Sequence, residues 1–151
     1  MYIILIQIDI ILDMIQKILV ALDGSKNSSR ALSKAIQLAT QTDASITGIS
    51  VIQSFPTEMG LVRTNVGKAL DKHYKRFMST AKMMCTKKNV KFSSIIKFGE
   101  EGKTIVSYAH KQNYDLIVIG SRGMGTLSEL FLGSTSNYVV HSSKIPVLII
   151  K

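Results

Sequence analysis

Four glycines and a run of hydroxyl side chains stand close together in the last third of the chain, in the stretch GSRGMGTLSELFLGSTS (120–136). Gly120 directly follows the apolar run DLIVI, and Gly133 directly precedes three hydroxyl residues. Glycine weakens regular structure unless the backbone needs a close approach or an unusual conformation. We therefore ask whether these residues form a binding site or only a turn.

The spacing of the glycines, G-x2-G-x9-G-S from Gly120 through Gly123 and Gly133 to Ser134, suits the binding of phosphate. We expect Gly120 at the carboxyl end of a strand and a helix that begins near Ser134. The first amides of a helix have no partner within it and lie at the positive end of its dipole, so they attract anions. Glycines allow a phosphate to approach them closely, and the hydroxyls after Gly133 can add donors. The stretch predicts a cradle for a polyphosphate, whereas any one glycine alone would indicate a turn.

The rest of the chain alternates short apolar runs with amphipathic segments. The apolar runs predict strands at 17–22, 44–52, 90–98, 115–120 and 146–150. Apolar residues at helical spacing predict helices at 28–39, about 65–88, after the turn at 99–102, and 134–143. Runs of this kind are typical of parallel strands buried on both faces, and the alternation requires crossovers that place helices on both faces. The sequence therefore predicts a single α/β domain, doubly wound and Rossmann-like.

Binding sites in such sheets lie beyond the carboxyl ends of the strands, where the strand order reverses. Asp23 ends the first expected strand and Gly120 ends the fourth. If these two strands are neighbours, both residues face one crevice. Asp-Gly-Ser is also a favourable turn, and Ser25 or Ser28 can cap the helix that follows, so a structural role for Asp23 is the alternative.

The composition is that of one globular domain. The chain has 151 residues, of which 46% are hydrophobic and 19% are charged, enough for a single core. Its one cysteine, Cys85, excludes an internal disulfide and a cysteine-held zinc cluster, and it fits a reducing cytoplasm. The net charge of +9 comes mostly from lysines spread along the chain, which predicts a solvated basic surface rather than nucleic-acid binding.

The N-terminal residues differ from the rest of the chain. The apolar run in MYIILIQIDIILDMIQ is broken by polar residues, among them Asp9 and Asp13, so it is too short for a membrane span. It also lacks the basic start and the small-residue cleavage site of a signal peptide. We expect residues 1–13 to be an extension, either packed on the domain or upstream of a natural start at Met14, and residues 14–151 to form the domain.

Other motifs predict less chemistry. GEEGKT (99–104) has two residues between its glycines where a Walker A loop has four, so we interpret it as a strand-to-helix turn. Glu100 and Glu101 would complement the dipole of the following helix. The histidines lack the spacing of metal ligands, and no G-x-S-x-G elbow is present. The sequence therefore predicts no catalytic residue and leaves any metal ligands unknown.

The glycine motif and two further segments resemble the universal stress protein family. The nucleotide-binding members of that family share G-x2-G-x9-G-(S/T), which this chain matches at Gly120, Gly123, Gly133 and Ser134. KILVALDGS near the start and KIPVLII at the end are similar to the family's first and last strands. The resemblance covers about 15–151, nearly everything except the N-terminal extension.

This resemblance implies a five-stranded parallel sheet of order 3-2-1-4-5 and a homodimer that binds ATP. The implied nucleotide-binding residues are Ala21, Leu22 and Val51 on the adenine side, Asp23 at the ribose or the metal-bound phosphates, and Gly120, Arg122, Gly123, Gly133, Ser134 and Thr135 at the phosphates. The last strand, Val147–Ile150, would form an apolar sheet edge, and pairing with a second copy would cover it.

Three kinds of function remain open. The first is a stress-response module that binds ATP with Mg²⁺, turns it over slowly at most, and passes a signal to an unknown downstream protein. Asp23 is the one general base expected near the phosphates, which argues against fast hydrolysis. The second is a slow ATPase or an enzyme that phosphorylates its own serine. The third is a chaperone-like dimer that needs no nucleotide.

Overall fold

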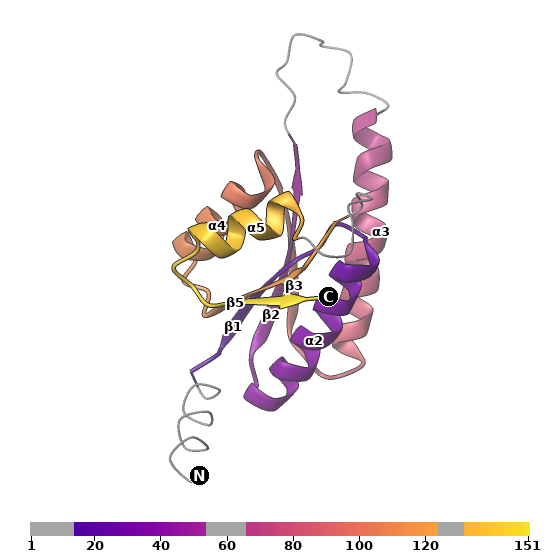
Figure 1. Ribbon diagram of the computed structural model, residues 1–151. Helices are drawn as coiled ribbons and strands as arrows, with labels where there is room; N and C mark the ends of the chain where they lie inside the picture. Colours follow the sequence, from indigo (N-terminus) through magenta and orange to yellow (C-terminus); the bar gives the residue numbers. More distant parts are fainter. Residues whose placement is uncertain (1–13, 54–65, 124–131) are drawn as a thin grey trace.

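The computed structural model describes residues 14–53, 66–123 and 132–151. The expected extension, residues 1–13, lies outside the described part of the chain. The described residues form one α/β unit with the sheet at its centre and helices on both sides (Figure 1).

Five parallel strands form the sheet, and their order confirms the predicted fold. The strands are β1 (Lys17–Ala21), β2 (Ser45–Ile52), β3 (Phe92–Phe98), β4 (Leu116–Gly120) and β5 (Val147–Ile150). They lie in the order β3-β2-β1-β4-β5, and every neighbouring pair is parallel. The strand order therefore reverses between β1 and β4, which brings the residues after both strands to one edge of the sheet.

Four helices of the described residues cover the sheet: α2 (Lys26–Thr42), α3 (Val66–Thr86), α4 (Glu101–Lys111) and α5 (Ser134–Ser142). Helices α2 and α3 pack on one face, and α4 and α5 pack on the other (Figure 1). Each expected helix is present, and its ends lie within two residues of the predicted ends where these were predicted, except that α2 continues three residues beyond its predicted end. None of the helices described here combines the length and the apolar character that a membrane crossing requires.

Strand β1 shows how the two halves of the core are divided. Ile18 and Val20 face α2 and α3, whereas Leu19 and Ala21 face α4 and α5. Consecutive side chains of a strand point to opposite faces, so a central strand covered on both sides is apolar at every position. This explains why residues 18–21 form a continuous apolar run rather than an alternating one.

The turn between β1 and α2 combines three local devices. Gly24 has a φ of +83°, a conformation that side chains rarely adopt, and Ser25 is the N-cap of α2. The Ser25 hydroxyl accepts a hydrogen bond from the Ser28 amide at 3.1 Å, so Ser25 is the capping residue of the two candidates. Oδ1 of Asp23 accepts a hydrogen bond from the Ser25 amide at 2.9 Å. The turn thereby holds Asp23 at the carboxyl end of β1.

Candidate functional site

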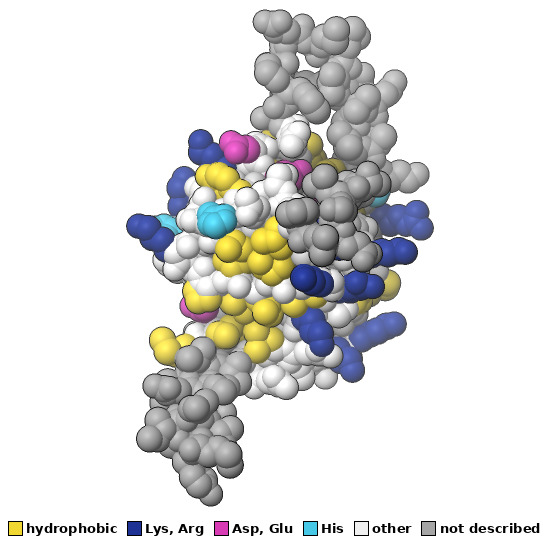
Figure 2. Space-filling model, in the orientation of Figure 1, with side chains coloured by type: hydrophobic (Ala, Val, Ile, Leu, Met, Phe, Trp, Pro, Cys, Tyr) yellow, Lys and Arg dark blue, Asp and Glu magenta, His cyan; other side chains and the backbone are white. Residues whose placement is uncertain are grey.

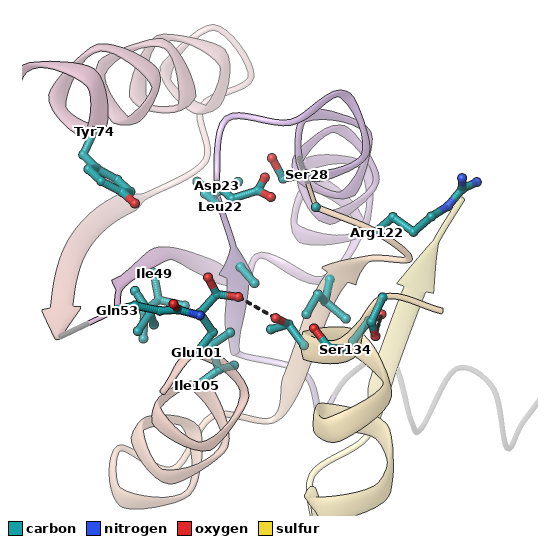
Figure 3. A pocket seen from close by; sticks show the side chains of 18 residues that line it. Leu22, Asp23, Ser28, Ile49, Gln53, Tyr74, Glu101, Ile105, Arg122 and Ser134 are labelled. Carbon is teal, nitrogen blue, oxygen red and sulfur yellow. Dashed lines mark hydrogen bonds between the residues drawn. The ribbon is translucent and has the colours of Figure 1, made fainter. Parts of the chain in front are cut away.

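A cavity of about 410 Å³ lies beyond the carboxyl ends of the central strands, where the strand order reverses. All ten residues that the sequence predicted at a nucleotide line this one cavity: Ala21, Leu22, Asp23, Val51, Gly120, Arg122, Gly123, Gly133, Ser134 and Thr135. The close-up in Figure 3 shows the cavity, with Leu22 and Asp23 after the end of β1 and Ser134 at the start of α5. The cavity has the size of a small-molecule site.

One side of the cavity is apolar, and the sequence interpretation identified only part of it. Ala21 and Val51 line the cavity here, and Ile49, Ile105 and Ile119 add to the apolar wall. Both Ile49 and Ile105 are almost fully buried, because they also belong to the core between the sheet and the helices α4 and α5. An apolar wall of this kind suits a flat, weakly polar group such as a nucleobase.

Another part of the cavity lining is the start of α5. Gly133 is the N-cap residue of this helix, and it has no side chain that could satisfy the first amides. The amides of Ser134, Thr135 and Ser136 therefore open the helix without a side-chain cap, and these three residues line the cavity. The Gly133 amide itself donates to the Ser121 carbonyl at 2.8 Å, so the predicted phosphate cradle is limited to the amides that follow it.

None of the contacts with described residues requires glycine at position 133. Its φ of −66° and ψ of 159° are open to any residue. A Cβ atom placed there would lie 3.4 Å from Cα of Arg122 and 3.6 Å from the carbonyl oxygen of Ser121, which are ordinary contacts. Gly133 lines the cavity without a side chain, at the point where the uncapped amides begin.

The hydroxyls after Gly133 correct one part of the prediction. We expected Ser134, Thr135 and Ser136 to offer hydroxyl donors to a phosphate. Instead, Thr135 donates its hydroxyl to Oε2 of Glu101 at 2.5 Å, and the buried Ser136 hydroxyl donates to the Ser121 carbonyl at 2.8 Å. In Thr135 and Ser136 the hydroxyl therefore makes a hydrogen bond within the protein, whereas the backbone amide belongs to the uncapped helix start. Ser134 is the exposed residue of the three.

The other two motif glycines make close contacts within the protein, Gly120 with backbone and Gly123 with a side chain. A Cβ atom on Gly120 would lie 2.8 Å from the backbone carbonyl carbon of Asn27, at the start of α2. A Cβ atom on Gly123 would lie 2.7 Å from Oδ2 of Asp23. Both distances are shorter than real Cβ contacts. Gly120 therefore leaves room for the start of helix α2, and Gly123 leaves room for the Asp23 carboxylate. These contacts refine the prediction from the sequence, in which all three glycines allow a phosphate to approach closely.

Asp23 and Arg122 take different positions at the cavity. Asp23 combines its structural and its candidate functional roles, since Oδ1 holds the turn and Oδ2 lies next to Gly123. Arg122 lies between Gly120 and Gly123 in the chain, but in Figure 3 its guanidinium points away from the interior of the cavity. Its contact with a phosphate stays a prediction.

Two lining residues, Tyr74 of α3 and Glu101 of α4, were missed as site residues. Burial raises the pKa of the Tyr74 hydroxyl, and the carboxylates of Glu101 and Asp23 raise it further, while Ser50 acts in the opposite direction. Oγ of Ser50 is buried and makes no hydrogen bond of normal length to a described residue. Tyr74 therefore faces two carboxylates across the cavity. Glu101 could have been found from its position, because it begins the helix that follows β3 at the same edge of the sheet.

A parallel sheet of this order, with a cavity at the switch point and an uncapped helix start, defines a doubly wound α/β protein with a candidate binding site beyond its strand ends. The profile of the universal stress protein family matches residues 14–151. The chain belongs to the universal stress protein family. Among described parts 14–53, 66–123 and 132–151, no group of three or more histidine, cysteine, aspartate or glutamate side chains is arranged to hold a metal ion.

Individual relatives agree with this assignment. Universal stress protein YxiE of Bacillus subtilis is 32% identical over 148 residues, which cover 91% of this chain and 100% of that protein. The structure of universal stress protein UspA from Lactobacillus plantarum superposes with a TM-score of 0.81 at 26% identity, covering 90% of this chain and 97% of that one. A universal stress protein solved in complex with cAMP has a TM-score of 0.69 at 26% identity, covering 90% and 96% of the two chains.

Proposed function

We propose that this protein is an ATP-binding regulatory module of the stress response, with slow turnover of the nucleotide at most. The observation that carries the proposal is the cavity with two unlike sides: an apolar wall at Ile49 and Ile105, and uncapped helix amides beside Gly133. A nucleotide has the same two unlike ends, a base and an anionic phosphate chain. The relative that was solved with cAMP supports nucleotide binding at this fold.

Each end of the cavity would bind one end of ATP. Ala21, Val51 and the isoleucines would contact the base, where burial of apolar surface contributes roughly 25 cal/mol per Å². The amides that open α5 would donate to the phosphates, and a charge-assisted hydrogen bond contributes about 1.5–3 kcal/mol. Gly133 would let the phosphates come close to these amides, because no side chain stands between them.

Mg²⁺ would reach the site on the phosphates rather than in a protein cage. Oδ2 of Asp23 is the carboxylate oxygen beside Gly123, and Mg²⁺ commonly takes one or two carboxylates together with phosphate oxygens and water. The other oxygen of Asp23 already accepts a hydrogen bond from the Ser25 amide. A carboxylate held in this way supports a role in holding Mg²⁺ more than one as a mobile general base, which is why we propose slow turnover.

We also propose that the protein is a homodimer paired through β5, Val147–Ile150. This strand lies at one edge of the sheet and pairs with β4 on its other side. Leu148 is 37% exposed there, and Val140 of α5 is 38% exposed. Figure 2 shows hydrophobic side chains gathered on the face of the molecule where β5 lies. Pairing with a second copy would cover an uncharged edge that otherwise invites aggregation.

The test of nucleotide binding begins with protein purified without added nucleotide, denatured, and analysed for released ligand by liquid chromatography and mass spectrometry. We expect ATP in a near-equal ratio to protein, or saturable ATP binding by calorimetry if the ligand is lost in purification. Released ADP would favour the slow ATPase instead. Gly133→Val, prepared in parallel, should be folded and empty. A wild-type protein that holds no nucleotide and shows no ATP binding would contradict the proposal and favour a dimer that acts without nucleotide.

A further inference from the structure

We propose that Glu101 accepts a hydrogen bond from a ribose hydroxyl and thereby makes the site selective for ribonucleotides over deoxyribonucleotides. This inference rests on the proposed nucleotide site and adds a residue that the glycine motif does not contain. It follows from where the Glu101 carboxylate lies between the two unlike sides of the cavity.

Two contacts locate that carboxylate. Glu101 is the first residue of α4, and Ile105 of the apolar wall lies four residues further along the same helix, so both side chains are on one face. Oε2 of Glu101 accepts the hydroxyl hydrogen bond of Thr135 at 2.5 Å, and Thr135 stands in the first turn of α5. The carboxylate thus lies between the wall for the base and the amides for the phosphates (Figure 3).

The position of Glu101 is held by the packing of α4 on α5. A Cβ atom on Gly102 would lie 2.8 Å from Cδ1 of Tyr138, so glycine at this position lets the two helices approach closely. Gly102 is buried, and its neighbour Glu101 is half-buried. The hydrogen bond to Thr135 then orients the carboxylate, since it occupies Oε2 and leaves Oε1 as the acceptor for a ligand.

The chemistry of the ligand decides which part of it Glu101 contacts. A carboxylate repels phosphate oxygens, and it can only accept hydrogen bonds. In a nucleotide the ribose connects the base to the phosphates, and its hydroxyls are donors at this junction. Carboxylates that accept ribose hydroxyls recur in dinucleotide-binding folds, at a different position of the sheet. The ribose is therefore the part of the nucleotide that matches a carboxylate at the middle of the cavity.

The experiment measures the dissociation constants of ATP, 2′-deoxy-ATP and 3′-deoxy-ATP by calorimetry for the wild type and two variants. Glu101→Ala removes the acceptor, and Glu100→Ala is the matched control, because Glu100 is an exposed neighbour whose side chain makes no cap hydrogen bond. We expect the wild type to bind at least one deoxy analogue about tenfold more weakly than ATP. This ratio should fall to about one in Glu101→Ala and stay at the wild-type value in Glu100→Ala.

The ratio isolates the contact because any general effect of the substitution on folding or phosphate repulsion acts on ATP and its analogues alike. Equal binding of all three nucleotides by the wild type would overturn the inference while leaving the nucleotide site intact. An unchanged discrimination in Glu101→Ala would overturn it as well, by assigning the ribose contact to another group. Failure of the wild type to bind any of the three would instead refute the proposed function itself.

Discussion

Two glycines of the same motif should respond oppositely to the same small substitution. Gly120→Ala should destabilise the fold, and Gly133→Ala should leave the fold intact and weaken nucleotide binding. A Cβ atom on Gly120 would meet the Asn27 carbonyl carbon at 2.8 Å, whereas the nearest contact for Gly133 is 3.4 Å. The first distance involves backbone of α2, which cannot swing aside as the end of a side chain can.

The magnitudes follow from these distances. In Gly120→Ala, the start of α2 must move by roughly 0.7 Å, the difference between 2.8 Å and a usual carbon–carbon contact of about 3.5 Å. Overpacking of this kind costs about 1–3 kcal/mol. In Gly133→Ala, the reduced freedom of the unfolded chain and the poorer N-cap residue act in opposite directions, so the free energy of unfolding should change by no more than about 0.5 kcal/mol.

The effect of Gly133→Ala on affinity should be much larger. A methyl group at the start of α5 would keep phosphate away from its first amides. Losing two charge-assisted hydrogen bonds should weaken ATP binding at least about a hundredfold, because each factor of ten in the dissociation constant corresponds to about 1.4 kcal/mol. Urea denaturation followed by circular dichroism measures stability, and calorimetry measures ATP affinity. Undiminished ATP affinity in a folded Gly133→Ala protein would refute the assigned phosphate side, and wild-type stability of Gly120→Ala would refute the packing argument.

Three more predictions use other parts of the structure. Burial raises the pKa of the Cys85 thiol to about 11, so a thiol reagent at pH 8 should modify it only in urea; rapid labelling of the native protein would contradict this. Leu148→Arg should shift the protein from dimer to monomer in analytical ultracentrifugation, whereas Met83→Arg, at an exposed position of α3, should leave the dimer intact. A Leu148→Arg protein that is still a dimer would exclude pairing through β5. Asp23→Asn should keep the turn through its amide oxygen, with stability within about 0.5 kcal/mol, and should reduce the strengthening of ATP binding by Mg²⁺; an unchanged Mg²⁺ effect in calorimetry would remove Asp23 from the metal site.

Patterns of neighbouring residues were sufficient to predict the elements of this fold. The run KILVA indicates a strand buried on both faces, and Asp-Gly-Ser indicates the turn after it, because these preferences depend on residues that are adjacent in the chain. The match to the family's glycine motif supplied the strand order and the ten lining residues, which a periodic pattern alone does not determine. The prediction that Asp23 and Gly120 face one crevice was confirmed, since β1 and β4 are neighbours.

The sequence by itself thus determined the strands, the helices and the edge of the sheet at which a ligand would bind. Only the tertiary structure decided that Gly120 makes room for Asn27, that Thr135 binds Glu101, and that Tyr74 faces two carboxylates. Thirty or more residues separate the partners in the first two of these contacts, 27 from 120 and 101 from 135. Local preferences act along a few neighbouring residues, whereas such contacts exist only once packing has set the distance between helices.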